Sequence, residues 1–319
     1  NMSQLGAVLN GVGAGAGAID PPIKGLFVYN CNPVATVPDQ NAVIRGLCRE
    51  DLFTVVLEQV LTDSAAYADI LLPATTFLEH HDIRTSYGTY VAGGVTPVIE
   101  PCGEARSNAE VFAALGRDMG WDDEAFRWPA DSYIAQVAKN MEVGSRDGDS
   151  AIFERGALQR CEFGDGNPVQ FGTVAPLTSD GIVDLTPTTL GPKPYEFDPV
   201  ESPDHPLTLI SPANSRMVSS TLGEFNYDEL VVTVHPDDAG PRGISDKDVI
   251  RVFNGLGEVV CRAELRSAVR PGVVSMPKGA WRKSSRNGST STALCPDHVN
   301  VVGGGACYND ARVEIAPVR

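Results

Sequence analysis

The most reactive-looking group of side chains in the sequence is the stretch LEHHD, in which His80 and His81 stand between Glu79 and Asp82. Imidazole and carboxylate groups are common ligands of zinc and other divalent metals. Adjacent histidines, however, point to opposite sides of a strand or about 100° apart on a helix, which is poor geometry for one ion. The spacing H-E-x-x-H would suit zinc, and this stretch does not have it. We therefore interpret the stretch as a loop that leaves the end of an apolar run.

The seven cysteines are scattered along the chain, and none of them form a C-x-x-C pair. The sequence therefore lacks the spacing of a zinc ribbon or of an iron–sulfur loop. An odd, scattered set favours reduced thiols that pack as small apolar side chains in a cytoplasmic protein.

The composition is that of an ordinary globular protein, with 319 residues of which 42% are hydrophobic and 21% are charged. This length favours two domains over one. The net charge of −16 argues against a nucleic-acid partner, because binding to phosphates needs a basic surface. No apolar run approaches the roughly 18 to 20 residues that span a bilayer, and the first residues lack the basic region of a signal peptide. We expect a cytoplasmic protein without a membrane span.

The first hundred residues alternate between apolar runs and helical patterns. The runs IKGLFVYN (23–30), LFTVVLEQ (52–59) and DILLPA (69–74) predict three buried strands. Between the first two, the stretch QNAVIRGLCRED (40–51) has a helical pattern of apolar residues at Val43, Ile44 and Leu47, continued by Leu52. A short helix is expected to begin at Thr62, Asp63 or Ser64. This order predicts a parallel sheet with helices on its faces. The Gly/Ala-rich residues 1–20 are expected to form a loop, or a segment whose packing partner is missing.

The pattern changes twice further along the chain. Residues 107–121 and 131–142 have helical patterns, and Ser107 or Asn108 is the expected cap of the first helix. Proline and glycine then accumulate, which predicts a domain boundary near residue 200. From residue 206 short β-branched runs recur between Gly, Pro and Asn-Gly turns, and this predicts a closed β-barrel of ~110 residues.

Two sets of motifs resemble a known family. The runs IKGLFVYNCNPVATVPDQ, LFTVVLEQVLTDSAAYADILLPATTFLEHHD and SYG are similar to the α/β domain of the molybdopterin oxidoreductases, the DMSO reductase superfamily, with formate-dehydrogenase-like members. The later runs PLTLISPANSRMVSS, VRPGVVSMPKGAW and GGGACYNDARVEI are similar to the molybdopterin-dinucleotide-binding domain of that family. The resemblance covers about two thirds of the chain.

The resemblance implies an α/β plus β fold, in which an incomplete dinucleotide-type parallel sheet with helices is followed by a double-psi β-barrel. The implied domains are part of the α/β domain at 1–100, a helical connector with parts of neighbouring domains at 101–204, and the cofactor-binding barrel at 205–319. The implied cofactor is molybdopterin guanine dinucleotide (bis-MGD) with molybdenum or tungsten. The implied cofactor-binding residues are Asn30, Asn32, Pro33, Glu58, Thr62, Ser64, Glu79, Ser211, Asn214, Ser215, Arg216, Ser219, Ser220, Trp281, Thr292, Asp297, Tyr308 and Asn309, with Tyr87 and Gly88 nearby as loop elements.

The chemistry of the cofactor agrees with these residue types. The N1–H and N2–H₂ groups of guanine need a carboxylate, and Glu58 stands at the end of an expected strand. A pyrophosphate needs the backbone N–H groups and hydroxyls of loops that follow parallel strands. Several residues also have simpler interpretations: Thr62 and Ser64 as helix caps, Trp281 as a packing residue, and GSTSTA (288–293) as a flexible surface loop. The sequence also departs from the family, because Thr292 stands where an asparagine is usual.

The resemblance further implies a function. The chain would be the C-terminal portion of a molybdenum oxidoreductase, for a two-electron redox reaction or an oxygen-atom transfer on a small-molecule substrate. The metal ligand and any Fe–S cluster would then lie in an N-terminal half or a partner chain, and an electron-transfer subunit is a further possible partner. We predict that the chain alone is inactive and name no catalytic or metal-ligating residue in it. The alternative is a non-catalytic scaffold, comparable to the large subunit of respiratory complex I.

Overall fold

The structure, a computed structural model, describes residues 1–13, 17–88, 91–129, 132–134, 136–137, 159–160, 167–193, 195–196, 199–225 and 229–318. The chain forms two compact units, one of Asn1–Leu72 with Thr188–Arg319 and one of Pro73–Pro187. Segments from the two ends of the sequence therefore share a unit. The division into domains at 1–100, 101–204 and 205–319 stays a prediction.

The first unit contains the predicted parallel strands. β1 (Gly25–Tyr29) pairs in parallel with β2 (Phe53–Glu58), in a register that runs from Gly25↔Phe53 to Tyr29↔Leu57. β3 (Ile70–Pro73) adds to the other edge of β2, which gives the order β1-β2-β3. The three predicted strands are confirmed, but the prediction that the third is buried is wrong. Ile70 and Leu71, whose side chains point to opposite faces of the sheet, are 44% and 48% exposed, so neither face of β3 is well covered.

Short helices precede β1 and form the connections between the strands of this sheet. They are η1 (Met2–Gln4), α1 (Leu5–Leu9), α2 (Pro33–Thr36), α3 (Gln40–Leu47) and η2 (Ser64–Tyr67). The prediction that residues 1–20 form a loop is wrong at α1, which packs against α3. A Cβ atom on Gly6 would lie 2.8 Å from the Cβ of Ala42, and one on Gly46 would lie 2.4 Å from the Cβ of Leu9. The glycines therefore let the two helices approach each other closely, and Leu9 is fully buried between them.

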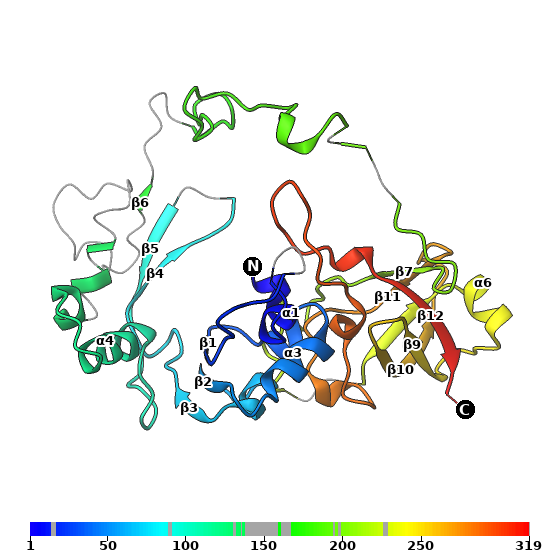
Figure 1. The fold of residues 1–319 in the computed structure, drawn as a ribbon, viewed down its shortest axis with the longest axis horizontal. Helices are drawn as coiled ribbons and strands as arrows, with labels where there is room; N and C mark the ends of the chain where they lie inside the picture. The colour runs from blue at the N-terminus through cyan, green and yellow to red at the C-terminus, as the bar shows by residue number, and fades with distance from the viewer. Residues whose placement is uncertain are drawn as a thin grey trace. The chain divides into compact units, whose positions relative to one another are not determined.

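A closed six-stranded barrel forms the rest of the first unit, at the yellow-to-red end of the chain in Figure 1. Its strands are β7 (Leu207–Ile210), β8 (Val231–Val234), β9 (Val249–Phe253), β10 (Glu258–Leu265), β11 (Val273–Ser275) and β12 (Arg312–Pro317). The order around the barrel is β10-β8-β11-β7-β12-β9, and the pairs β10/β8 and β11/β7 are parallel. The predicted barrel is confirmed.

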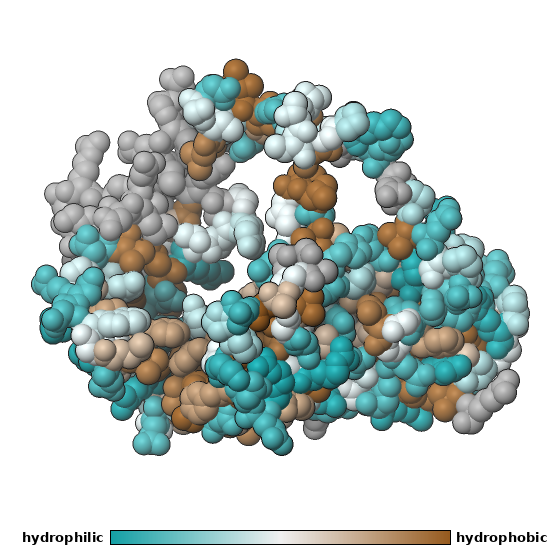
Figure 2. Space-filling model, in the orientation of Figure 1, coloured by the Kyte–Doolittle hydropathy of each residue, from teal (hydrophilic) through white to brown (hydrophobic). Residues whose placement is uncertain are grey.

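Every second residue of the barrel strands points inward and forms the core. In β10, for example, Val259, Cys261 and Ala263 are fully buried and their neighbours are not. Polar side chains cover much of the barrel's outer surface in Figure 2. The barrel's connections carry one α-helical turn, α6 (Pro236–Ala239), and the 3₁₀ turns η6 (Gly240–Arg242), η7 (Arg282–Ser284), η8 (Ser291–Leu294) and η9 (Tyr308–Asp310). Another 3₁₀ turn, η5 (Thr188–Leu190), precedes the first barrel strand.

The second unit holds an antiparallel sheet of β4 (Asp82–Thr85), β5 (Val91–Val95) and β6 (Gln159–Arg160), the helix α4 (Asn108–Asp118) and the turn η3 (Glu124–Arg127). The predicted cap of α4 is confirmed, because Ser107 and Glu110 form a reciprocal capping box. Most of the helix predicted at 131–142 lies outside the described residues. In the described part of the chain, no helix has the length and apolar character that crossing a membrane requires.

Candidate functional site

Asn32 and Ser64 meet at the carboxyl ends of β1 and β2. Oδ1 of Asn32 accepts hydrogen bonds from the N–H (3.2 Å) and from the hydroxyl (2.7 Å) of Ser64. The Ser64 hydroxyl oxygen in turn accepts the N–H of Val34 in α2 (3.0 Å). Asn32 is only 3% exposed, and its Nδ2 has no hydrogen-bond partner among the described residues. A buried amide donor without a partner costs free energy, so this group is suited to an acceptor from a ligand.

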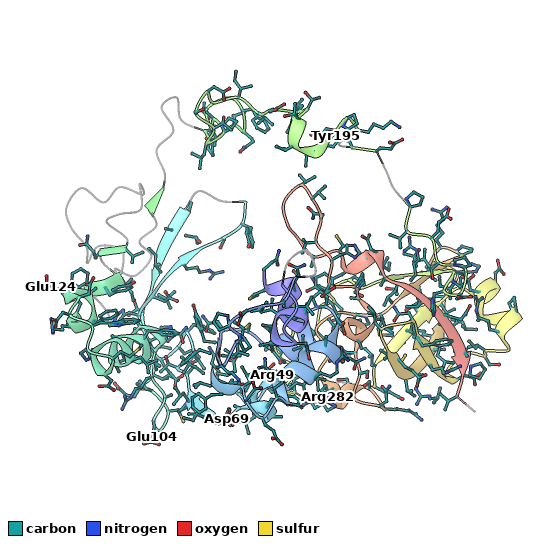
Figure 3. The ribbon with its side chains drawn as sticks, viewed as in Figure 1. Arg49, Asp69, Glu104, Glu124, Tyr195 and Arg282 are labelled. Atoms are coloured by element: carbon teal, nitrogen blue, oxygen red, sulfur yellow. The ribbon has the colours of Figure 1, made fainter. Side chains whose placement is uncertain are left out.

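Two acids on the β2 side face loops of the barrel. Burial raises the pKa of Glu58; the N–H of Gln59 opposes this rise, and the charge of Glu224 adds to it. Burial also raises the pKa of Asp63, whose Oδ2 accepts the backbone N–H of Arg282 (2.8 Å). The Arg282 side chain, marked in Figure 3, bonds with the hydroxyl of Tyr67. The end of β2 therefore lies beside the barrel loops around residues 224 and 282.

Gln40 joins α2 and α3 to a third barrel loop. Its side chain is fully buried, and its Nε2 donates to the carbonyl of Val34 (2.7 Å) and to Oγ1 of Thr290 (3.2 Å). Its Oε1 accepts the N–H of Thr290 (3.0 Å). The hydroxyls of Thr290 and Thr292 are 3.2 Å apart, and both residues are buried. The alternative that 288–293 is a flexible surface loop is therefore wrong, and Thr292 is bonded within the protein.

The loop after β7 and the turn η9 form a second polar cluster. Oδ1 of Asn309 accepts the N–H of Ser211 (3.2 Å), and the hydroxyl of Tyr308 donates to the carbonyl of Thr36 at the end of α2 (2.6 Å). The Ser211 hydroxyl is buried beside the thiol of Cys295 and makes no hydrogen bond of normal geometry in the described structure. Burial raises the pKa of Cys295 to about 12, although the neighbouring Ser211 hydroxyl lowers it. The thiol is therefore protonated, and it donates to the carbonyl of Ser291 (3.2 Å).

The loop at 211–220 is ordered by the side chains of Asn214 and Trp281. Oδ1 of Asn214 accepts the N–H groups of Arg216 (2.9 Å) and of Met217 (2.8 Å). Ser219 and Ser220 both have positive φ angles, 49° and 72°. The indole N–H of Trp281 donates to the carbonyl of Ser220 (2.9 Å), and Trp281 is 6% exposed. Trp281 therefore fixes the shape of the loop from within the protein.

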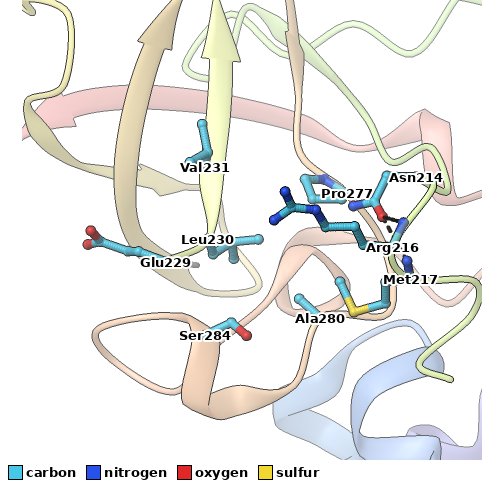
Figure 4. Close-up of a pocket in the computed structure, with 9 residues that line it drawn as sticks. All are labelled: Asn214, Arg216, Met217, Glu229, Leu230, Val231, Pro277, Ala280 and Ser284. Carbon is cyan, nitrogen blue, oxygen red and sulfur yellow. Dashed lines mark hydrogen bonds between the residues drawn. The ribbon is translucent and has the colours of Figure 1, made fainter. Parts of the chain in front are cut away.

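A cavity of about 170 Å³ lies between this loop and the start of β8. Figure 4 shows Arg216 and Met217 on one side of it, Glu229 and Leu230 on the other, and Ala280 at its base. The volume is below that of most cofactor pockets, so only a part of a larger ligand would fit.

Glu79 belongs to the second unit, where it organises its own loop. Its carboxylate accepts the N–H (2.6 Å) and the hydroxyl (2.8 Å) of Thr76 and the N–H of Cys102 (2.7 Å). The N–H of Thr76 is the main reason why the pKa of Glu79 is lowered. Nearby, Tyr87 is fully exposed. Within the described residues, the stretch from Glu79 to Asp82 contains no group of three possible metal ligands.

The structure brings together eight of the predicted residues around α2. They are Asn32, Pro33, Thr62, Ser64, Ser211, Thr292, Tyr308 and Asn309. Oγ1 of Thr62 accepts the N–H of Ala65 in η2, whose N-cap residue is Asp63. Glu58, Ser219, Ser220 and Trp281 lie on adjoining loops of the same unit, whereas Asn214, Ser215 and Arg216 are exposed. Asn30 has a positive φ of 53°, and Asp297 is half-buried.

Sequence reasoning missed Gln40 and Arg282, whose side chains join these loops to α2 and η2. The available signal was a polar residue on the apolar side of an expected helix. Gln40 is the first residue of α3, and it is fully buried.

Comparison with known families gives two matches along the chain. Residues 7–118 match the family described as molybdopterin oxidoreductase, and residues 213–312 match the molydopterin dinucleotide binding domain. Two separate segments of the chain are thus similar to molybdopterin-related families. The first match includes β1, β2, β3 and α4, and the second includes most of the barrel.

The curated proteins that the chain resembles are longer than the chain. It is 34% identical to the probable oxidoreductase YoaE of Bacillus subtilis (strain 168) over 331 residues, which cover 100% of the chain and 47% of that protein. It is 28% identical to the dimethyl sulfoxide/trimethylamine N-oxide reductase of Cereibacter sphaeroides, over 84% of the chain and 37% of the reductase. The chain thus spans less than half the length of these curated relatives.

A solved structure supports the fold. The acetylene hydratase from Pelobacter acetylenicus superposes with a TM-score of 0.79 over 100% of the chain and 46% of the hydratase, at 18% sequence identity. At this identity the likeness establishes the shared fold.

Proposed function

We propose that this chain binds molybdopterin guanine dinucleotide and is the C-terminal portion of a molybdenum oxidoreductase. The reaction of the whole protein would be a two-electron oxidation or reduction, or an oxygen-atom transfer, on a small-molecule substrate. The family supports a molybdopterin cofactor. The observation that carries the proposal for this chain is the pair of buried polar groups, Nδ2 of Asn32 and Oγ of Ser211, that have no partner of normal geometry among the described residues.

The residues around α2 fit such a ligand. Asn32 offers amide donors, and Ser211 offers a hydroxyl that both donates and accepts. Glu58 offers a half-buried carboxylate with a raised pKa, and the N–H groups of a guanine would stabilise its charged form. Because each of these groups lacks full solvation in the described structure, hydrogen bonds to a ligand would replace what burial removed.

The roles in this proposal are binding and positioning. The bound cofactor would supply the redox chemistry through its metal, and the protein would supply its placement and electrostatics. Asn32 and Ser211 would hold polar groups of the cofactor from opposite ends of α2, and Trp281 would keep the loop at 211–220 in shape. We propose no catalytic residue in this chain, and we place the metal ligand and any Fe–S cluster elsewhere in the protein or in a partner.

The finer features of the resemblance also belong to the proposal. They are the double-psi topology of the barrel, the bis-MGD form of the cofactor, an electron-transfer partner and a cytoplasmic location. The mixture of parallel and antiparallel pairs in the closed barrel supports the first of these.

The substitution Ser211→Ala is the sharpest test, because it removes only an atom that has no hydrogen bond of normal geometry here. We expect the free energy of unfolding without cofactor to be unchanged or slightly higher. Cofactor affinity should fall by about 2- to 10-fold, the value of one hydrogen bond of roughly 0.5–1.5 kcal/mol. The measurement is the fluorescent pterin that acid-iodine oxidation releases from the purified protein containing this chain.

The substitution Asn32→Asp is a second, independent test of the same candidate site. It keeps the acceptor that Ser64 uses and replaces the amide donor, so bound pterin should decrease although the loop retains its bonds. The matched control is Asn41→Asp, because the Asn41 side chain lies on the exposed side of α3 and bonds with the carbonyl of Leu256. If the unaltered protein released no pterin, the scaffold function would be favoured; if both site variants kept it, the assignment of these residues would be wrong.

A further inference from the structure

A second group of side chains with metal-binding chemistry lies in the barrel's last connection, outside the cluster around α2. His298, Cys307 and Asp310 bring one nitrogen, one sulfur and one oxygen atom to within 4.8 Å of one another. The rest of the described structure contains no other group of three such residues. His298 Nε2 lies 2.8 Å from Oδ2 of Asp310, and both side chains are about half exposed.

The backbone explains why these three residues meet. Val299 and Ala306 form an antiparallel bridge, which places the preceding His298 opposite the following Cys307. The connection between them is a short turn, closed by bonds from the N–H of Asn300 to the carbonyl of Gly305 (2.9 Å) and from the N–H of Gly304 to the carbonyl of Asn300 (3.0 Å). Two residues that face each other across paired strands have a defined separation. The hairpin backbone therefore holds His298 and Cys307 close together.

The third residue is supplied by a helical turn. Cys307 is the N-cap of η9, and Asp310 is the last residue of that turn. In a 3₁₀ turn, residues three apart lie on the same side, because there are three residues per turn. Asp310 therefore stands on the side of Cys307, and the histidine reaches both from across the hairpin.

We propose that His298, Cys307 and Asp310 form a binding site for a zinc-like divalent cation. Imidazole, thiolate and carboxylate are the three ligand types that proteins use for zinc, with metal–ligand distances of about 2.0–2.3 Å. Tetrahedral ligands at those distances are roughly 3.3–3.8 Å apart, so side-chain rotations from the present separations complete the site. Three protein ligands leave the fourth position for water, and the exposure of His298 and Asp310 gives the ion an entry path.

Such an ion would act on the loop that carries candidate cofactor residues. Tyr308 and Asn309 stand between Cys307 and Asp310, and they bond with Thr36 and Ser211. A metal that joined the hairpin to both ends of η9 would restrict the motion of this turn. The proposed ion is separate from the redox metal of the cofactor and needs no redox change of its own.

Cobalt(II) is the probe, because it replaces zinc and reports its ligands through absorption. Purified protein containing this chain is treated with a chelator and titrated with Co²⁺. We expect one equivalent to give the near-ultraviolet band of sulfur-to-cobalt charge transfer and the strong visible bands of a tetrahedral site, with both reversed by Zn²⁺. Difference spectra against the metal-free protein remove any contribution of the molybdopterin.

Variants decide whether the band belongs to this site. Cys307→Ser should abolish the charge-transfer band, and His298→Gln and Asp310→Asn should weaken Co²⁺ binding by about 10-fold or more. Cys48→Ser is the control, because Cys48 is another exposed thiol of the first unit. Thermal unfolding without metal should be similar in all variants, and added Zn²⁺ should raise the Tm of the unaltered protein and of Cys48→Ser only. The proposal is overturned if the unaltered protein shows no band, or if the band survives in Cys307→Ser. Neither result depends on whether the molybdopterin proposal is right.

Discussion

Replacing Gln40 by alanine tests whether its side chain holds the α/β segment and the barrel together. The substitution leaves two buried backbone groups, the carbonyl of Val34 and the N–H of Thr290, without the side-chain partner they have now. Each such group costs about 1–3 kcal/mol, so we expect Gln40→Ala to lower the free energy of unfolding by about 4 kcal/mol. For a unit of this size that corresponds to a decrease in Tm of about 8–16 °C.

The assay is urea unfolding followed by circular dichroism, with Asn41→Ala as the matched control. Asn41 lies next to Gln40 on the same helix, and its Nδ2 donates to the carbonyl of Leu256 in the barrel (3.0 Å). This hydrogen bond also joins the α/β segment to the barrel, but it is exposed to solvent. Its loss should cost about 0.5–1.5 kcal/mol. If the two variants unfolded at the same urea concentration, or if Gln40→Ala cost less than about 1 kcal/mol, the buried contact would not have the importance that we give it.

Two further predictions concern the loops of the first unit. A Cβ on Gly223 would lie 2.0 Å from Nε1 of Trp281, so Gly223→Ala should lower stability by about 1–3 kcal/mol and change the tryptophan fluorescence, whereas Gly255→Ala, which meets open space, should do neither. The Cys295 thiol, with a pKa of about 12 raised by burial, should resist a disulfide reagent at pH 8 until the protein unfolds. The exposed Cys48 should react within the mixing period of the same native sample, and fast labelling of Cys295 would contradict the packing described.

The strands were predictable from sequence because their signals are local. Val259, Cys261 and Ala263 alternate with outward-facing residues in β10, and this period of two is visible in the sequence itself. The helix α1 was not predictable in this way, because Gly6 and the glycines near it have the composition of a loop. At position 6 a larger residue would collide with Ala42 of α3, so the need for glycine comes from a residue far away in the sequence.

The same distinction between local signals and distant contacts applies to the candidate site. The Asn-Pro motif at Asn32 and the polar loop that contains Ser211 were found because each follows an apolar run. The partner choices were not found: Asn32 bonds with Ser64, and Gln40 bonds with Thr290, residues distant in sequence. Such pairings depend on how the segments pack. The sequence shows that a side chain can form hydrogen bonds, but it does not show with which distant residue.

The joining of Asn1–Leu72 with Thr188–Arg319 in one unit has a consequence during synthesis. Thr290, the partner of Gln40, and Tyr308, the partner of Thr36, are translated long after the first strands leave the ribosome. At translation rates of about 5–20 residues per second, the roughly 250 residues in between take roughly 12–50 s. During that interval the groups of α2 and α3 that later bond with barrel loops, such as the Gln40 side chain and the carbonyl of Thr36, lack those partners. The nascent chain therefore has a defined window in which a chaperone would protect it, and slower translation would lengthen that window.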